Sequence, residues 1–372
     1  MLASEAPLDA LLCAATAVRA QAKGNVVSYS KKVFIPLTTL CRDYCSYCTF
    51  RRDPGQVGAH FMTPDEVVDL AEQGSRAGCK ETLFSLGDQP ERMFPEAREF
   101  LSQRGFGRTL DYVAAMSELV LDETGLLPHA NPGVMDRPAL ERFKRSNASV
   151  GLMLENISLR LIHHGLPHAE APDKVPVLRL RTMEDAGKLS IAFTTGILIG
   201  IGETVEERID SLLAIRRVHE QYGHIQEVIV QNFRAKPEIP MASHPDPSLE
   251  ELLRTLSLAR LILGSEMNLQ APPNLSYGYF PRLLERESTI GAGSRRLPKT
   301  SSIQRRPGPR LSGCGPKPRR ADSFFARGLR CIRNTRSAKP SCHSGCASGW
   351  SASRTETGLR SRALGSLTDH DR

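Results

Sequence analysis

Short apolar runs alternate with longer amphipathic stretches between residues 30 and 275 of the 372-residue chain. The apolar runs have the length and the flanking turn residues of buried strands. They read KKVFIPLTT (31–39), ETLFSLG (81–87), LLPHANPG (126–133), VGLMLEN (150–156), AFTTGILIG (192–200), EVIVQNF (227–233) and MNLQAPPN (267–274). Between them, apolar positions recur with the period of a helix, as in TPDEVVDLAEQGSRAG (63–78) and ETVEERIDSLLAIRRVHEQYG (203–223). In the first of these, Thr63 is placed to cap the helix and Pro64 occupies its first position.

A strand followed by a helix, repeated seven times, predicts an α/β fold with a parallel sheet. Seven units suit a (β/α) TIM-type barrel whose eighth unit is missing. Polar and glycine residues gather at the carboxyl ends of the strands, in SLGDQPE, HANPG, LEN, GIGET, QNF and APPN. Loops are polar and rich in turn residues in any protein. Six clusters in register nonetheless favour an active site at the mouth of the barrel, where the loops that follow the strands meet.

The N-terminal segment, residues 1–27, is predicted to form a lead-in helix ahead of the barrel, which spans residues 28–286. Glu5 and Asp9 stand where a secretory signal would carry basic residues. No apolar run approaches the ~18 residues of a membrane span. The cysteine total of nine is odd, and together with the missing secretion signal it predicts a reducing, cytoplasmic location.

The chain changes character after residue 286. From Gly291 onward, 18 Lys and Arg stand against 4 Asp and Glu, so the first 290 residues hold the remaining 31 basic and 37 acidic groups. The basic balance therefore belongs to the tail, and a nucleic-acid-binding function of the globular part is not supported. Residues 287–372 lack helix or strand periodicity and are predicted to form a disordered basic tail.

A one-base shift of the reading frame from Arg286, with permitted codons, gives an amino-acid sequence with the pattern of an eighth strand, a loop and a closing helix. We therefore interpret residues 287–372 as a frameshift product, which resequencing of the gene around that codon would test. On this interpretation the tail cysteines have no chemical role; they are Cys314, Cys331, Cys342 and Cys346. The alternative is a second metal site, but the tail offers no partner pair at zinc-finger spacing.

Three cysteines, Cys41, Cys45 and Cys48, follow the first predicted strand in a C-x3-C-x2-C pattern. Structural zinc sites take four ligands, commonly in two separated pairs, and disulfide frameworks need an even count and an oxidising compartment. Three thiolates on one loop suit a cubane iron–sulfur cluster whose fourth iron stays open for a substrate or cosubstrate. Unrelated buried thiols are the alternative. Tyr47 offers an aromatic face beside such a cluster or simply packs the loop, and Cys79 is predicted to be a core thiol.

In this spacing, with an aromatic residue before the third cysteine, the sequence resembles the radical S-adenosylmethionine (SAM) superfamily. The resemblance implies that Cys41, Cys45 and Cys48 ligate three irons of a [4Fe–4S] cluster, and that the fourth iron takes the amino and carboxylate groups of SAM. One electron from the cluster would cleave SAM to methionine and a 5′-deoxyadenosyl radical, which abstracts a substrate hydrogen. The cofactors carry this chemistry, while the protein positions them.

The resemblance extends to residues outside the cysteine loop. Backbone groups near Gly87 and the Asp88 side chain, in SLGDQPE, would hold the ammonium of SAM, since glycine permits a close backbone approach. Glu155 would meet the methionine or ribose polar groups, and Arg179 would pair with the SAM carboxylate. The GILIGIGET motif (196–204), with Gly200, would let adenine lie against the backbone. The structural alternatives are a turn cap for Asp88, an ion pair for Glu155 and a solvated helix face for Arg179.

Within the superfamily, the segments YSKKVFIPLTTLCRDYCSYCTF, LFSLGDQPE, TGLLPHANPGVM, FTTGILIGIGET, HIQEVIVQNFRAK and QAPPNL resemble the deazaflavin-forming synthases. This resemblance covers residues 28–286. It implies a radical SAM carbon–nitrogen lyase that cyclises 5-amino-5-(4-hydroxybenzyl)-6-(D-ribitylimino)-5,6-dihydrouracil to 7,8-didemethyl-8-hydroxy-5-deazariboflavin (FO). Ammonia, methionine and 5′-deoxyadenosine are released. A partner radical SAM synthase would supply the substrate, and a low-potential donor would supply the electron.

The general base of this reaction is not assigned by the sequence. Candidate substrate contacts at mouth-facing strand ends are His129, Thr194, Gln231, Asn232 and Asn274. Loss of the eighth unit would expose an edge strand and remove one wall of the substrate pocket. The alternative functions are another radical SAM enzyme, either the partner synthase or a menaquinone-pathway relative, and a non-catalytic iron–sulfur protein.

Overall fold

The computed structural model of the chain describes residues 5–24, 27–28, 30–275 and 294–295. Contacts divide the chain into two units, Met1–Gly313 and Cys314–Arg372, and all the described residues belong to the first. The predicted disordered tail and its cysteines lie outside the described residues, except for a two-residue strand discussed below.

The strands of the first unit form one sheet in which every neighbouring pair is parallel. Their bounds are β1 Lys31–Pro36, β2 Glu81–Ser85, β3 Leu127–Asn131, β4 Ser149–Gly151, β5 Phe193–Ile199, β6 Ile225–Asn232, β7 Leu269–Gln270 and β8 Ser294–Arg295. The order β7-β6-β5-β4-β3-β2-β1-β8 makes consecutive strands neighbours, as in a barrel. All seven predicted strands are confirmed, and β4 and β7 are shorter than the apolar runs that predicted them.

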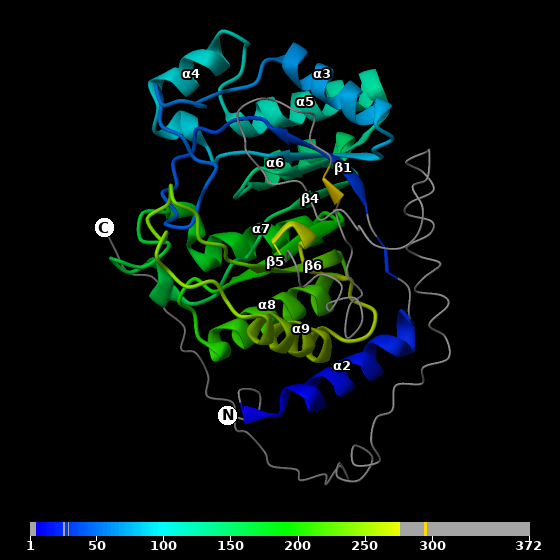
Figure 1. Cartoon of the computed structure of the whole chain (residues 1–372). Helices are drawn as coiled ribbons and strands as arrows, with labels where there is room; N and C mark the ends of the chain where they lie inside the picture. The colour runs from blue at the N-terminus through cyan, green and yellow to red at the C-terminus, as the bar shows by residue number, and fades with distance from the viewer. Residues whose placement is uncertain (1–4, 25–26, 29, 276–293, 296–372) are drawn as a thin grey trace, which may run out of the picture. The chain divides into compact units, whose positions relative to one another are not determined.

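Helices separate the strands along the chain and cover the outside of the sheet (Figure 1). The α-helices are α2 Leu8–Ala22, α3 Pro64–Arg76, α4 Pro95–Ser102, α5 Thr109–Thr124, α6 Arg137–Ser146, α7 Pro176–Lys188, α8 Val205–Tyr222 and α9 Leu249–Leu263. Short 3₁₀ turns lie between them, η1 Pro90–Arg92, η2 Leu159–Ile162, η3 Pro172–Lys174 and η4 Pro273–Leu275. Helix α3 packs on β1, α5 on β3, α8 on β5 and α9 on β6, which is the pattern of a β/α barrel.

Local sequence explains where the main helices begin. The Thr63 side chain accepts a hydrogen bond from the backbone N–H of Glu66, and the Glu66 carboxylate accepts one from the backbone N–H of Thr63. This capping box satisfies two N–H groups that the helix itself leaves unpaired, and Pro64 needs no partner. The predicted start of α3 is therefore confirmed, and Thr204 begins α8 in the same way.

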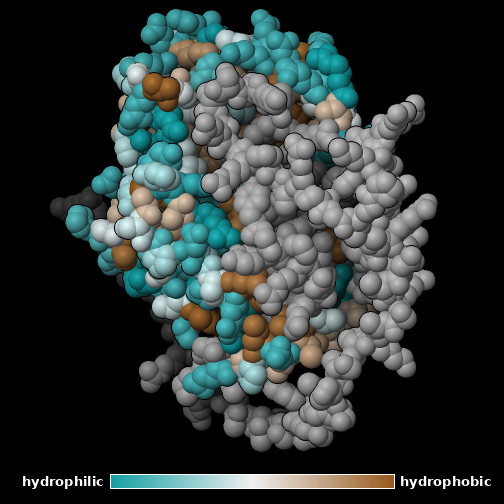
Figure 2. All heavy atoms as spheres, in the orientation of Figure 1, coloured by the Kyte–Doolittle hydropathy of each residue, from teal (hydrophilic) through white to brown (hydrophobic). Residues whose placement is uncertain are grey.

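Helix α2, Leu8–Ala22, lies within the segment expected to lead into the barrel, and it runs along α9 (Figure 1). Arg254 of α9 donates a hydrogen bond of 2.6 Å to the Ala6 carbonyl, so the N-terminal segment is attached to the barrel. None of the helices within the described residues is both long enough and apolar enough to cross a membrane. Figure 2 shows mostly hydrophilic side chains over the α3 and α4 end of the described surface, with apolar ones scattered between them.

Alternation along the strands decides which side chains face the barrel interior. A Cβ added at Gly74 of α3 would lie 2.5 Å from the Val33 side chain, so Val33 faces the helices. Lys32 therefore faces the interior, where its charge acts on Glu227 of β6, a strand that is not its neighbour in the sheet. Residues on the Glu227 side of β6 line the interior, and those on the Val228 side pack against the helices.

The eighth position of the sheet is not empty. Strand β8, Ser294–Arg295, pairs in parallel with Lys31 and Lys32 of β1. The prediction that residues after 286 contribute no strand is therefore wrong at these two residues. Backbone pairing needs no side-chain periodicity, so the sequence pattern could not reveal it. Among the described residues, no pairing joins β7 to β8, and the barrel stays open at that edge.

Candidate active site

The three cysteines of the C-x3-C-x2-C pattern lie on the loop that follows β1, at the mouth of the barrel. The turn after β2 packs against this loop, with the Gly87 N–H donating to the Thr38 carbonyl at 3.0 Å. A Cβ at Gly87 would lie 1.9 Å from the Leu40 carbonyl oxygen and 2.6 Å from Cys41 Cβ. Gly87 therefore does permit a close backbone approach, and the structure places that approach against the cysteine loop itself.

The surroundings of the thiols suit metal-bound thiolates. Cys41 Sγ accepts hydrogen bonds from the backbone N–H groups of Asp88, at 3.2 Å, and Asp43, at 3.4 Å. Burial raises the pKa of Cys41 and brings the pKa of Cys45 to about 12, so the thiols keep their protons until a metal displaces them. None of the three cysteines forms a disulfide.

The spread of the thiols argues against a single zinc ion. Three thiolates on one tetrahedral zinc lie about 3.8 Å apart, given a Zn–S bond of about 2.3 Å. Among the described residues, a carboxylate oxygen from each of Asp43, Asp88 and Asp173 lies within 4.8 Å of the other two. The sulfur atoms of the three cysteines do not meet this criterion. A multi-iron cluster accepts thiolates that stand further apart.

A second segment, Pro167–Lys174, runs along the cysteine loop and is here called the clasp segment. The backbone N–H of Tyr44 donates to the Glu170 carbonyl at 2.8 Å, and that of Ser46 donates to the Pro167 carbonyl at 3.0 Å. The hydroxyl of Tyr47 is hydrogen-bonded to Nε2 of His168 at 3.0 Å. These bonds hold a loop that has no regular structure of its own.

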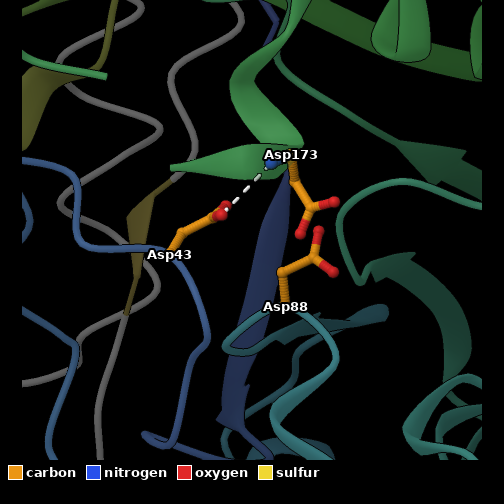
Figure 3. Close-up of side chains that lie close together, drawn as sticks. All are labelled: Asp43, Asp88 and Asp173. Atoms are coloured by element: carbon orange, nitrogen blue, oxygen red, sulfur yellow. Dashed lines mark hydrogen bonds between the residues drawn. The ribbon is translucent and has the colours of Figure 1, made fainter. Parts of the chain in front are cut away.

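The clasp segment also brings charge to the site. Arg42 forms a bidentate ion pair with Asp173, with Nε 2.8 Å from Oδ2. Asp173, Asp43 and Asp88 meet in one place, and Figure 3 shows the carboxylates of Asp88 and Asp173 facing one another. The Asp173 N–H donates to Asp43 Oδ1 at 3.2 Å (Figure 3). Arg42 therefore pairs with two of these three buried carboxylates, since its Nε also lies 4.0 Å from Asp88.

One carboxylate oxygen of Asp88 is buried without a hydrogen bond and could accept one from a ligand. Its Oδ2 accepts the Val134 N–H at 3.1 Å, whereas Oδ1 is buried without a hydrogen bond. Burial, followed by the nearby charge of Asp173, raises the pKa of Asp88 well above its usual range. A cationic ligand at this position would supply both the missing hydrogen bond and the missing charge.

Glu155 also has a buried carboxylate oxygen without a hydrogen bond, here called an open oxygen as for Asp88. It follows β4 with a φ of 63°, a conformation that costs roughly 1–3 kcal/mol in a residue other than glycine. Hydrogen bonds to Gly196 and Leu198 of β5 hold it there. Lys174 Nζ lies 2.6 Å from its Oε1, and Oε2 is buried without a hydrogen bond. Burial opposes ionisation, but Lys174 and Arg179 outweigh it and lower the pKa of Glu155.

Arg179 and Gly200 complete the predicted cofactor contacts. Arg179 lies in the first turn of α7 and is buried, so it does not lie on a solvated helix face. Its guanidinium donates to the carbonyls of Met153, at 2.7 Å, and Asp173, at 2.9 Å. Gly200 has a φ of 85°, and an added Cβ would lie 2.6 Å from Pro247. Glycine is therefore required at this turn.

The predicted substrate contacts do not lie together. Thr194 is the second residue of β5, at the foot of the barrel, where the strands begin, and it accepts a hydrogen bond from Gln226. His129 is bonded at 2.6 Å to Ser149, the first residue of β4. The expected mouth position is therefore wrong for both, because Thr194 lies near the start of β5 and His129 in the middle of β3.

Gln231 and Asn232 are neighbours at the carboxyl end of β6 and point to opposite faces. Gln231 shares the interior face of Glu227, and its side chain has no hydrogen bond to another described residue. Asn232 is buried on the helix-facing side and donates to the Leu275 carbonyl at 3.0 Å, so its predicted mouth-facing orientation is wrong. Asn274 lies in η4 beyond β7, half-buried.

Five residues of this site were missed by the sequence analysis: Arg42, Asp43, His168, Asp173 and Lys174. Arg42 and Asp43 lie inside the cysteine motif, so their position alone could have suggested them. The other three belong to the clasp segment, which carries no motif and approaches the cysteines only after folding. Cys79 is confirmed as a residue of the main core.

The sequence model of the radical SAM superfamily matches residues 35–215 of the chain. A 7,8-didemethyl-8-hydroxy-5-deazariboflavin synthase of Methanopyrus kandleri is 51% identical over 251 residues, which are 68% of this chain and 75% of that protein. The chain belongs to this family of radical SAM proteins. An FO synthase of Mycobacterium tuberculosis (strain H37Rv) is 54% identical over 272 residues, 72% of this chain. The chain spans 31% of the length of that relative.

A methylornithine synthase (PylB) has the same fold, with a TM-score of 0.63 over 88% of each chain at 20% identity. The radical SAM family uses a [4Fe–4S] cluster and SAM. The residues described above fit both groups. Cys41, Cys45 and Cys48 supply three soft ligands at one loop. The buried carboxylates of Asp88 and Glu155 lie close to Asp173 and Lys174, the last two residues of the clasp segment.

Proposed function

We propose that this chain catalyses the radical SAM cyclisation of 5-amino-5-(4-hydroxybenzyl)-6-(D-ribitylimino)-5,6-dihydrouracil to FO, with release of ammonia, methionine and 5′-deoxyadenosine. The observation that carries the proposal is a C-x3-C-x2-C loop, clasped at the barrel mouth, in a chain 51% identical to a 7,8-didemethyl-8-hydroxy-5-deazariboflavin synthase. Radical SAM chemistry alone would fit many substrates, and the high identity over the barrel supports this one.

The cluster and SAM, when bound, would supply the radical chemistry: one-electron cleavage of SAM, and abstraction of a substrate hydrogen atom by the radical that results. The chain's own residues hold these groups. In this proposal Cys41, Cys45 and Cys48 ligate iron, and Tyr47 covers the cluster from the clasp side. Open oxygens on Asp88 and Glu155 accept hydrogen bonds from the polar groups of SAM, since both oxygens are buried and otherwise unsatisfied.

Arg179 and Gly200 act less directly in this scheme. The two carbonyl bonds of Arg179 fix its guanidinium beside Glu155, where it adds positive charge next to the SAM carboxylate. Gly200 keeps the turn after β5 narrow enough for a flat ring to lie against the backbone.

The barrel interior offers polar groups for the substrate. Gln231 faces it from β6, and Ser85 and Asn131 are register partners at the carboxyl ends of β2 and β3. None of these side chains has a hydrogen bond to another described residue. We place the ribityl and uracil groups against them, since both carry several donors and acceptors. His129 and Thr194 lie deeper and already have partners.

The first experiment is anaerobic reconstitution of the full chain with iron and sulfide, followed by SAM, a reductant and the hydroxybenzyl adduct. Formation of both 5′-deoxyadenosine and a fluorescent deazaflavin would support the proposal. Deoxyadenosine without deazaflavin would reject the assigned substrate or this chain's competence to convert it. Neither product, from a protein with a full cluster, would reject the roles of Asp88, Glu155 and Arg179.

The partners in this scheme are a second radical SAM synthase that makes the adduct and a low-potential electron donor. The substrate's hydroxybenzyl and ribityluracil halves must be joined by such a preceding reaction. A cytoplasmic location stays a prediction.

A further inference from the structure

A single lysine stands beside the cysteine loop with its charge largely removed from solvent. The Lys174 side chain is 11% exposed, and its Nζ lies 2.6 Å from Glu155 Oε1. The same Nζ is 5.9 Å from the ring centroid of Tyr47. Because Tyr47 lies between Cys45 and Cys48 in the sequence, the ammonium group is adjacent to the loop that supplies the thiolates.

Placing this ammonium group carries a cost in folding free energy, because it buries an ion pair and keeps Glu155 in a left-handed backbone conformation. Lys174 ends the clasp segment, whose hydrogen bonds to the cysteine loop fix its approach. Its partner Glu155 keeps a left-handed backbone, with a φ of 63°. A buried ion pair contributes little net stability, and apolar residues of similar size commonly do as well. A role in stability alone therefore does not explain the pair.

Three other basic side chains near the clasp segment, Arg42, Arg179 and His168, have different surroundings. Arg42 is held by both oxygens of Asp173. Arg179 donates to two backbone carbonyls. Burial lowers the pKa of His168 to about 3, so this imidazole is neutral. Lys174 differs in that its ammonium group, held by the Glu155 carboxylate, lies beside the ring of Tyr47, between Cys45 and Cys48 in the sequence.

We propose that Lys174, held by Glu155, is a positioning residue that raises the reduction potential of the iron–sulfur cluster. Reduction by one electron adds a negative charge at the group that the three thiolates hold. A nearby ammonium stabilises the more negative state, and surrounding charge is one of the factors that set cluster potentials. The inference rests on the family's cluster and not on the identity of the substrate.

The test is a redox titration of the reconstituted full chain without SAM, with titanium(III) citrate as reductant and electron paramagnetic resonance as readout. Lys174→Met should lower the midpoint potential, with about a tenfold smaller ratio of reduced to oxidised cluster at a fixed applied potential. For a one-electron couple this ratio corresponds to about 59 mV. Lys174→Arg keeps the charge and should leave the potential near that of the wild type. Lys188→Met, at an exposed helix end, is the control and should change nothing.

Two further variants separate charge from packing. Glu155→Gln should raise the potential, because it removes a negative charge at nearly constant volume. The double variant K174M/E155Q should return it toward the wild-type value. An unchanged potential in both single variants, each with full iron content, would overturn the proposal.

Equal shifts in Lys174→Met and Lys174→Arg would also overturn it, since the effect would then come from shape. If Lys174→Met fails to take up iron, an unchanged potential in Glu155→Gln overturns the proposal, and a raised one supports it. Deazaflavin formation is not measured, so failure of the proposed reaction would leave this result intact.

Discussion

The mouth and the foot of the barrel both contain paired polar side chains, but they hold them in different ways. At the foot, Lys32 and Glu81 form an ion pair of 2.9 Å, and His129 bonds Ser149. Both pairs are direct register partners on adjacent strands. At the mouth, the main pair joins Arg42 to Asp173, from two loops separated by 131 positions in the chain.

The two ends also differ in what they leave unsatisfied. A pocket of about 280 Å³ opens at the foot, and two of the charged groups that line it, Lys32 and Glu81, pair with one another. At the mouth, one oxygen of Asp88 and one of Glu155 are buried without a partner, and each such group costs about 1–3 kcal/mol. Strand register alone builds the foot. The mouth depends on loops and keeps open positions that suit a ligand.

The largest effect should follow from changing the cysteine loop. Cys45→Ser should reduce the iron content of the reconstituted chain from about four per chain to a small fraction, because the cluster loses one of three protein ligands. Iron and sulfide analysis measures this directly. His129→Gln, at the foot, is the matched control and should keep the full iron content. Equal iron content in the two variants would contradict the assignment of cluster binding to the mouth rather than to the foot.

Breaking the loop-to-loop pair should have the next largest effect. Asp173→Asn removes the bidentate partner of Arg42 and leaves it the more distant Asp88 carboxylate, at 4.0 Å, in a largely buried position. We expect the free energy of unfolding to fall by about 3 kcal/mol. Urea unfolding of the reconstituted protein measures the change. Glu141→Gln, which breaks an exposed pair with Arg137, should cost no more than about 0.5 kcal/mol. A similar loss in both variants would show that the clasp pair behaves as an ordinary surface pair.

The foot should show its own signature in the dependence of stability on pH. Burial raises the pKa of Glu227 to about 7 from an unfolded value of 4.5, so folding favours the protonated form. This contribution is complete below pH 4.5 and is lost as the pH rises toward 7, by at most about 1.4 kcal/mol for each pH unit. Glu227→Gln mimics the protonated form. Its melting temperature relative to the wild type should therefore increase between pH 5 and pH 7, and a constant difference would contradict the assignment.

The smallest effect concerns substrate affinity. Gln231→Ala removes an unpaired amide that faces the interior near the mouth, and KM for the hydroxybenzyl adduct should rise about two- to tenfold, as for one lost hydrogen bond. Thr194→Val, at the foot, should change KM less than about twofold. Steady-state kinetics of deazaflavin fluorescence compares the two. A larger change in Thr194→Val would place the substrate at the other end of the interior.

Much of the fold could be predicted from local patterns. The seven apolar runs became β1 to β7, and Thr63 with Pro64 marked the start of α3 because capping depends on residues that are close in sequence. The cysteine spacing and the glycine at position 87 were recognisable for the same reason. Strand ends were less certain, since β4 covers only two residues of its apolar run, Val150 and Gly151. The mouth positions expected of Thr194 and His129 were wrong because neither residue lies at the carboxyl end of its own strand.

The sequence by itself determined the parallel α/β order, the cysteine loop and the family, because these depend on local periodicity and on motifs of a few residues. Only the tertiary structure decided that Pro167–Lys174 clasps the cysteine loop, that three aspartates meet beside Arg42, and that Lys174 stands against Tyr47. These contacts join segments about 130 residues apart. No spacing rule connects such segments, since their meeting depends on how the whole sheet curves and brings its loops together.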